Sequence, residues 1–434
     1  MYVIIDLTTY SRVRNLSFAP QTDVTGSAVP INEFGLEIFT TDDISFGQYA
    51  ELYDDRDNLW AKYWIYYAEH ITDNIVQIKA RSDIWLLDGV TLEPVLYSGE
   101  SIGNVLDDLM VRQTGAPGLV SPVDYTLDSS LSGITISGFC PQQTARARLQ
   151  WVCFVAGAYV KTFFNDEIEI LPIDATSALV PLDRIYWRPT VTYKDHVTAV
   201  KVIAYTFTQG TPQTTDKWVT DGTNYYIVTE QEYTLANSAA PSSAPDNVVT
   251  FKGVYLVNSG NVSGILSHIA PLYFKRTEVQ LDVVDNADYI PGDKLTVYAD
   301  EDTLFNGYAK DLSFAFGVQA KANMLLTAAE SVEGAKLVIL YKWDDMQIGR
   351  AEYTFPVGYS YTIQNLYLDW TMNGHQYVFR PTTATVTGTM TSAGATVTVN
   401  YAVALDLFEG VLHVISVDSV TVDSSGDVAI GVIA

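Results

Sequence analysis

The sequence has few basic residues relative to acidic ones, and this scarcity excludes a large class of functions. Lysine and arginine number 25 against 51 aspartates and glutamates, which gives a net charge of −26. A protein that binds nucleic acid needs basic patches that displace counterions from the phosphates, so this charge balance argues strongly against nucleic-acid binding. An acidic wall would, however, let a polyanion slide past without sticking to it.

Cysteine and histidine are also scarce and form no pattern of a metal or catalytic site. Cys140 and Cys153 have no CxxC spacing, and we expect two buried free thiols rather than a disulfide. The five histidines lack HxH, HxxxH and HExxH spacing, and no GxSxG or Cys/His arrangement stands in the context of a hydrolase family. We therefore expect no enzyme, no catalytic residue, no metal and no cofactor.

Long hydrophobic runs are missing, whereas β-forming residues are abundant. No apolar run approaches the roughly 20 residues that span a bilayer. The first residues, MYVIIDLTTYSRVRN, lack the features of a signal peptide, so we expect a product made in the cytoplasm. Apolar residues make up 48% and aromatic residues 12% of the chain, and tyrosine alone numbers 28. This composition predicts a folded, mainly β protein.

One stretch occurs twice. AELYDDRDNLWAKY (50–63) and LTVYADEDTLFNGY (295–308) match at a constant offset of 245, and VQIKA (76–80) echoes VQAKA (318–322) after a three-residue slip. Each copy has an alternating strand, an acidic turn and an aromatic start to the return strand, which predicts a β-hairpin. The repetition predicts two similar small β-barrels in one chain. The identical pairs are Tyr53/Tyr298, Asp55/Asp300, Asp57/Asp302, Leu59/Leu304 and Tyr63/Tyr308, with Trp60 matching Phe305.

Between the two copies the pattern changes to that of an α+β insert. Ser101 is the expected N-cap of one helix, Thr144 caps a second that ends at Gly157, and a hairpin turns at Asn165-Asp166. A short helix is expected from Val262 to about Tyr273. The expected domains are a first barrel (1–97), the α+β insert (98–180), a β-rich connecting domain contributing strands to the second barrel (181–268), the second barrel (269–332), a C-terminal β-module (333–403) and a terminal hairpin or arm (404–434).

The first three quarters of the chain resemble the tail-hub proteins of bacteriophages and related injection machines. The resemblance lies mainly in TARARLQWVCFVAGAYV, followed by the hairpin ending EIEILPI, and in the PGD turn (291–293) that introduces the second barrel. It implies a trimer whose six barrels form a pseudo-sixfold ring that continues a hexameric tail tube and lets DNA pass. The implied partners are two further copies, tail-tube or distal tail proteins, and tip or fibre proteins. The implied location is the tail tip of the virion, assembled in the host cytoplasm.

The C-terminal module, ILYKWDDMQIGRAEYTFPVGYSYTI followed by ATVTGTMTSAGATVTVNY, is similar to mucin-binding-type β-modules of Gram-positive surface proteins. It implies the alternative function, a host-surface adhesin or carbohydrate-binding tail protein whose partner is a cell-surface glycan or protein. The candidate surface-binding residues are Trp343, Trp370 and Tyr377.

Other functional interpretations are weaker. Asp55, Asp57, Asp300 and Asp302 offer oxygen ligands of the kind that Ca²⁺ takes, but the glycine and terminal glutamate of a calcium loop are missing. Paired carboxylates such as Asp54-Asp55 could serve a cell-wall hydrolase, but neighbouring carboxylates of this kind are more typical of solvated turns. We expect the aromatic residues of WAKYWIYY (60–67) to be core and subunit interface rather than a sugar-stacking platform. The candidate ring contacts are therefore Tyr53, Trp60, Tyr63, Tyr298, Phe305 and Tyr308.

Overall fold

Strands make up most of the chain, which confirms the mainly β prediction. The computed structural model describes residues 1–433 apart from 115–118, 174–176, 187, 285–288, 301–302, 316–320, 333, 344–345, 365–367, 373–374, 382–383, 392–393, 402–403, 409–410 and 423–427. The chain divides into two compact units, Met1–Leu295 with Asn306–Glu330, and Thr296–Phe305 with Ser331–Ala434. Among the described residues, no helix has the length and apolar character that crossing a membrane requires.

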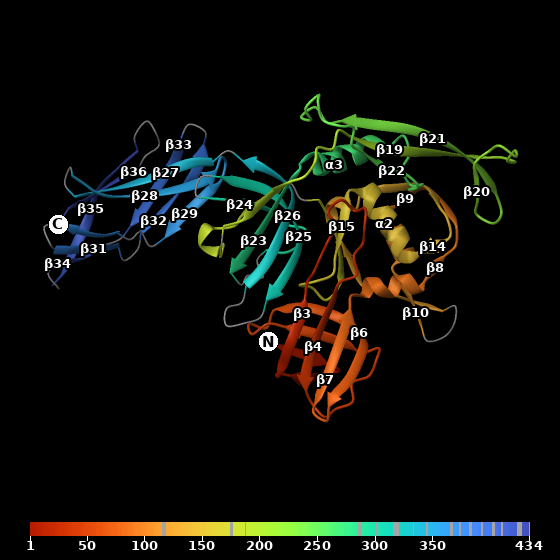
Figure 1. Cartoon of the computed structure of the whole chain (residues 1–434), viewed down its shortest axis with the longest axis horizontal. Coiled ribbons are helices and arrows are strands. Elements are labelled where there is room, and N and C mark those ends of the chain that lie inside the picture. The colour runs from red at the N-terminus through yellow and green to blue at the C-terminus, as the bar shows by residue number, and fades with distance from the viewer. Residues whose placement is uncertain are drawn as a thin grey trace. The chain divides into compact units, whose positions relative to one another are not determined.

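The N-terminal strands form one seven-stranded antiparallel sheet with the order β2-β1-β5-β6-β7-β4-β3. Its strongly curved strands β3, β4, β6 and β7 are visible in Figure 1. Alternate residues point inward and build an aromatic-rich core around Phe18, Phe34 and Tyr63. The strands are β1 (Tyr2–Ile5), β2 (Thr8–Tyr10), β3 (Val13–Phe18), β4 (Glu33–Phe39), β5 (Tyr49–Tyr53), β6 (Leu59–Thr72) and β7 (Ile75–Arg81).

A second sheet repeats this arrangement. Its order β17-β24-β25-β26-β23-β18 matches β1-β5-β6-β7-β4-β3 strand for strand, which confirms the prediction of two similar barrels. The boundary between the two units passes through β24 and β25. The strands are β17 (Ala178–Leu179), β18 (Thr190–Tyr193), β23 (Thr277–Val284), β24 (Lys294–Tyr298), β25 (Leu304–Ala315) and β26 (Lys321–Val332).

The repeated stretch gives the same hairpin twice. β5 ends at Tyr53 and β24 at Tyr298, and the return strands begin at Leu59 and Leu304. The turn closes through Asp54 N–H to Asn58 C=O (3.1 Å) in one copy and Ala299 N–H to Thr303 C=O (2.8 Å) in the other. The shorter repeat, VQIKA and VQAKA, falls partly outside the described residues. VQIKA lies inside β7, whereas 318–320 lie outside the described residues and β26 begins only at Lys321.

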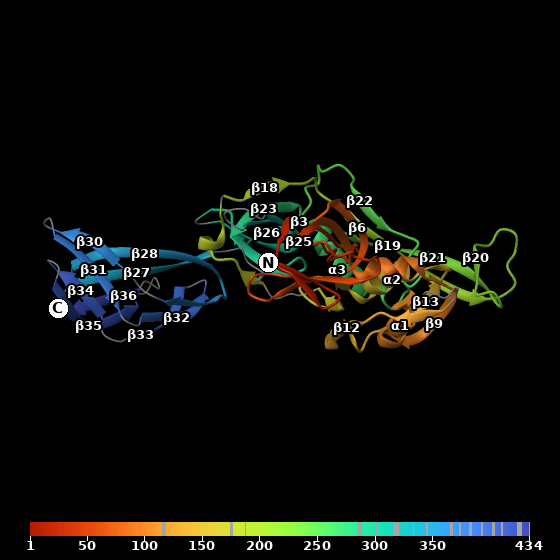
Figure 2. The same cartoon turned by 90° about the horizontal axis from the view of Figure 1, so that it is seen from below.

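The α+β insert lies between the two barrels in the chain and has the three expected parts. Ser101 Oγ accepts a hydrogen bond from Asn104 N–H and caps α1, and Thr144 Oγ1 caps α2 through Ala147 N–H. Gly157 ends α2 with a φ of +63°, a conformation that favours glycine. Figure 2 shows α1 beside β9 and β13. The elements are η1 (Asp83–Gly89), β8 (Thr91–Leu92), β9 (Val95–Ser101), α1 (Ile102–Leu109), β10 (Val111–Gln113), β11 (Val120–Pro122), β12 (Tyr125–Leu127), η2 (Ser129–Leu131), β13 (Thr135–Cys140), β14 (Gln143–Thr144), α2 (Ala145–Ala156), β15 (Ala158–Lys161) and β16 (Ile168–Pro172).

A separate four-stranded sheet, β20-β21-β19-β22, is inserted into the second barrel between β18 and β23. The segment Lys194-Asp195-His196 does not turn a hairpin, because β18 and β19 on either side of it belong to different sheets. Helix α3 packs against β19 and confirms the expected helix. The elements are η3 (Leu182–Arg184), β19 (Ala199–Gln209), β20 (Trp218–Thr220), β21 (Tyr225–Ala236), β22 (Val248–Phe251) and α3 (Val262–Phe274).

The C-terminal unit contains a seven-stranded sheet, β28-β27-β36-β35-β34-β31-β30, and a three-stranded sheet, β29-β32-β33. The last strands, β35 and β36, form a hairpin whose second strand runs parallel to β27. The strands are β27 (Gly334–Trp343), β28 (Met346–Pro356), β29 (Ser360–Gln364), β30 (Leu368–Met372), β31 (His375–Pro381), β32 (Ala384–Thr391), β33 (Gly394–Tyr401), β34 (Ala404–Phe408), β35 (Val411–Val422) and β36 (Val428–Ile433).

Candidate functional site: the junction between the two barrels

The two barrels are joined by a short stretch of strand pairing. After β3 the chain leaves its own sheet, and Gln21 forms an antiparallel bridge with Asp311 of β25. Thr22 N–H donates to Lys310 C=O and Leu312 N–H donates to Pro20 C=O, both at 3.1 Å. Because these bonds run from backbone to backbone, the second half of β25 adds a strand neighbour to the first barrel without requiring particular side chains.

Aromatic side chains fill the space beside this pairing. Phe314 of β25 stacks on Phe18 with ring centroids 6.0 Å apart, and its centroid lies 4.4 Å from that of Trp60. The insert contributes Phe164, whose N–H donates to Trp60 C=O at 2.8 Å. Phe18 and Trp60 are only 2% and 3% exposed. Both barrels and the insert therefore share one aromatic core, which holds the barrels in a fixed relation.

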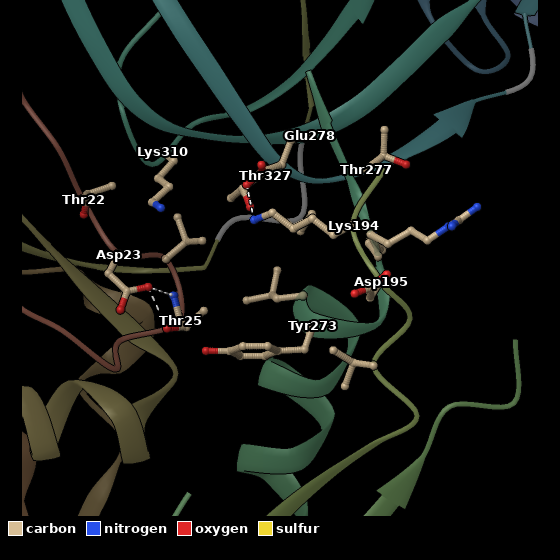
Figure 3. Close-up of a pocket in the computed structure, with 16 residues that line it drawn as sticks. Thr22, Asp23, Thr25, Lys194, Asp195, Tyr273, Thr277, Glu278, Lys310 and Thr327 are labelled. Atoms are coloured by element: carbon tan, nitrogen blue, oxygen red, sulfur yellow. Dashed lines mark hydrogen bonds and ion pairs between the residues drawn. The ribbon is translucent and has the colours of Figure 1, made fainter. Parts of the chain in front are cut away.

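A charged cavity of about 340 Å³ lies next to the junction (Figure 3). Residues 22–25, the end of α3 and parts of β23, β25 and β26 line it. Lys194 forms an ion pair with Glu278 of the neighbouring strand, and Lys275 pairs with Glu330 at 2.7 Å. Burial raises the pKa of the Tyr273 hydroxyl, and the nearby Asp23 carboxylate raises it further. Two of the lysines that line this cavity are thus ion-paired within the chain.

Burial is the main influence on the pKa of Asp311, the junction carboxyl. Burial raises the pKa of the Asp311 carboxyl, and neighbouring Lys310 acts in the opposite direction. In the described part of the chain, no three His, Cys, Asp or Glu side chains gather as a metal site would require. The arrangement is suited to holding protein segments together.

One GxSxG pattern is present, at residues 99–103, where β9 meets α1. Ser101 has φ −63° and ψ +144°, which is ordinary extended backbone. A nucleophile elbow instead places its serine on a strained turn between strand and helix. The Ser101 hydroxyl accepts a hydrogen bond from Asn104 N–H at 3.3 Å, so its role in this structure is that of a helix cap.

Five of the six candidate ring contacts lie inside the chain's own core. Trp60, Tyr63, Tyr298, Phe305 and Tyr308 are all less than 9% exposed. Tyr53 is partly buried and stacks on Tyr2 with centroids 5.1 Å apart. Burial raises the pKa of Tyr298 to about 12. The prediction of ring contacts stays a prediction, and within one chain these aromatic rings serve to pack the barrels.

In the first copy, the aspartates of the acidic turn make hydrogen bonds and an ion pair within the chain. Asp54 accepts hydrogen bonds from Arg56 N–H and Asn58 N–H, at 2.8 and 2.9 Å. Asp55 pairs with the N-terminal amino group, and Asp57 accepts a hydrogen bond from the Tyr2 hydroxyl at 2.9 Å. In the second copy Asp300 accepts from Thr303 N–H at 2.7 Å, while Asp302 lies outside the described residues.

The candidate surface-binding residues lie in the C-terminal unit. Trp343 belongs to β27, and Trp370 of β30 is the direct cross-strand partner of Tyr377 of β31. The side chains of these three residues lie outside what the structure describes, so their role stays a prediction.

The fold is that of known tail proteins. The tail protein from Neisseria meningitidis MC58 superimposes with a TM-score of 0.50 at 10% identity, covering 75% of this chain and 95% of that chain. The 43 kDa tail protein of prophage MuSo2 from Shewanella oneidensis gives 0.50 at 9% identity, covering 75% and 96%. The prophage tail protein gp18 from Listeria monocytogenes EGD-e gives 0.46 at 10% identity, covering 74% and 90%.

At these identities the likeness concerns the fold alone, and it confirms the expected resemblance to phage tail proteins at that level. No family model matches the sequence, and a search of curated proteins finds no match. The resemblance of the C-terminal module to mucin-binding-type modules stays a prediction.

Proposed function

We propose that this protein is a structural component of a phage or phage-like tail, the hub of its tip, and that it works as a trimer. The observation that carries the proposal is the matching order of six strands in the two barrel sheets within one chain. Three chains with two equivalent barrels each present six similar surfaces, which is what a ring beneath a hexameric tube needs. The fold likeness to two tail proteins supports the same role.

The proposed mechanism is symmetry matching rather than chemistry. The shared aromatic core of Phe18, Trp60 and Phe314 fixes the two barrels of one chain relative to each other, so a rigid pair becomes the unit of assembly. With a net charge of −26, a ring of three copies carries a strongly acidic surface. Such a surface along the lumen would let DNA pass without binding it.

In this proposal the partners are the tube or distal tail proteins on one side of the ring and tip or fibre proteins on the other. The location is the virion tail tip, with assembly in the host cytoplasm. The proposed role involves no catalysis and no cofactor.

Electron microscopy of the purified full chain tests the proposal. Class averages of negatively stained particles should show a ring with six lobes of similar size, two from each chain. Single elongated particles, or rings with another number of lobes, would contradict it. The Phe314→Ala variant provides a second test, because it should loosen the contact between the two barrels and blur the six lobes. The control is Phe46→Ala, at a 68% exposed position, which should leave the lobes unchanged.

A further inference from the structure

Matching backbone hydrogen bonds relate the two hairpins residue by residue beyond the repeated stretch. Gly47 N–H donates to Ile65 C=O, and Ile65 N–H donates to Gln48 C=O. In the second barrel Gly292 N–H donates to Ala309 C=O, and Ala309 N–H donates to Asp293 C=O. Ile65 and Ala309 are therefore equivalent. The offset falls by one residue from 245 because β6 carries an irregularity beside Trp60, where its pairing with β5 skips from Leu59 to Ala61.

This equivalence identifies the part of β6 that corresponds to the junction. Lys310, Asp311 and Leu312, which pair with residues 20–22 inside the chain, correspond to Tyr66, Tyr67 and Ala68. In β6 this stretch lies beyond the start of β5, whose first residue, Tyr49, pairs with Trp64. Among the described residues, no strand pairs with that side of β6, and residues 69–74 beyond it are exposed.

The other half of the junction also has an equivalent. Phe18 pairs with Phe34 and Val191 pairs with Val279, and β4 and β23 correspond at the offset of 245. Pro20, Gln21 and Thr22 therefore correspond to Tyr193, Lys194 and Asp195. This segment starts at Tyr193, the last residue of β18, which is an edge strand of its sheet.

The backbone groups of this segment face in the required direction. Lys194 N–H donates to Arg276 C=O at 2.8 Å, back towards its own sheet. Because neighbouring residues in an extended segment alternate in direction, Tyr193 C=O and Asp195 N–H point away from that sheet. They are the equivalents of Pro20 C=O and Thr22 N–H, the two groups that make the junction bonds. The Tyr193 side chain is 59% exposed.

We infer that residues 193–195 of one chain pair as a strand with residues 66–68 of a second copy. This contact between chains would have the same geometry as the junction between the two barrels within each chain. The inference rests on the proposed function, since it names the interface that closes the trimer. The matched bonds are Asp195 N–H to Tyr66 C=O and Ala68 N–H to Tyr193 C=O. The contact rests on these backbone bonds, because the Lys194 side chain is already ion-paired with Glu278 of its own chain.

A paired cysteine experiment tests this interface. In the junction, Gln21 and Asp311 form the non-hydrogen-bonded type of pair, whose Cα atoms lie about 4.5 Å apart, within the range for a disulfide. The variant Lys194→Cys/Tyr67→Cys places thiols at the equivalent pair between chains. Mild oxidation should give a covalent trimer as the largest species on a non-reducing gel, and neither single variant should give it.

The matched control is Gln21→Cys/Asp311→Cys, which should lose two free thiols on oxidation and stay monomeric on the gel. The native Cys140 and Cys153 do not interfere, because both are buried and burial raises the pKa of each to about 12. If the wild-type protein is a trimer and the control oxidises, but no covalent trimer forms, the interface is wrong and the proposed function stands. If the wild-type protein is a monomer, both the interface and the proposed function are wrong.

A backbone variant gives a second, independent result. Asp195→Pro removes the N–H donor of the proposed bond, whereas Asp195→Ala removes the side chain and keeps the donor. Asp195→Pro should raise the protein concentration needed for half-maximal trimer formation at least tenfold. Asp195→Ala should leave that concentration close to the wild-type value. A trimer that tolerates Asp195→Pro as well as Asp195→Ala would overturn the inference.

Discussion

The indole ring of Trp60 and the phenyl ring of Phe314 lie with centroids 4.4 Å apart, although the two residues belong to different barrels. Phe18 and Phe164 complete the cluster, so the first barrel, the second barrel and the insert share one core. A change in this cluster therefore affects both the stability of the chain and the relation between the barrels that a ring would need.

Replacing Phe18 by alanine should destabilise the protein by about 3 kcal/mol, the lower end for a buried Phe→Ala change, because it leaves a cavity among four aromatic rings. Urea denaturation followed by tryptophan fluorescence measures the free energy of unfolding. Phe46→Ala is the control, since Phe46 is 68% exposed and should change that free energy by less than about 0.5 kcal/mol. Equal effects of the two variants would contradict the shared core.

Gly138 and Gly103 should respond in opposite ways to alanine. Gly138 has a φ of +129°, and a Cβ there would collide with Tyr255 C=O, so Gly138→Ala should destabilise the chain by more than about 1 kcal/mol. Gly103 lies in α1 with open space around its Cα, and Gly103→Ala should be neutral or stabilising by up to about 1 kcal/mol. Thermal unfolding of both variants checks the difference in sign.

The turn before β21 should loosen in acid. The backbone N–H groups of Asn224 and Thr223, followed by the Tyr226 hydroxyl, hold the pKa of Asp221 well below its usual range. A carboxyl whose folded pKa is lowered contributes stability above its unfolded pKa of about 4, and this contribution is lost as pH falls towards the folded value. Hydrogen exchange at Thr223 and Asn224, corrected for the intrinsic pH dependence, should therefore lose protection below about pH 4.

Asp221→Asn is the control for that experiment. It should show weaker protection at neutral pH and no further loss between pH 5 and pH 3. Wild-type protection that stays constant over this range would contradict the role given to the carboxylate.

The sequence predicted the local parts of this fold well, because their signals are local. The acidic turn, the aromatic return strand and the caps at Ser101 and Thr144 each depend on residues a few positions apart. The two thiols are free and buried, as predicted. The repeated stretch identified the β5–β6 and β24–β25 hairpins with the right ends.

The long-range parts could not be predicted in the same way. The pairing of residues 20–22 with 310–312 joins positions far apart in sequence, which no local pattern reveals. Lys194-Asp195-His196 resembles a hairpin turn, yet the strands on either side enter different sheets. One further signal was present but weak, since the offset of 245 also relates Glu33 to Glu278 and Leu36 to Leu281 in β4 and β23.

The mass of the purified full chain in solution tests the central claim most directly. Light scattering coupled to size exclusion, run over a hundredfold range of concentration, should give a species of about three times 47.9 kDa at the upper end. A mass that stays at that of one chain throughout, or that settles at two chains, would contradict the account of a trimeric ring built from duplicated barrels.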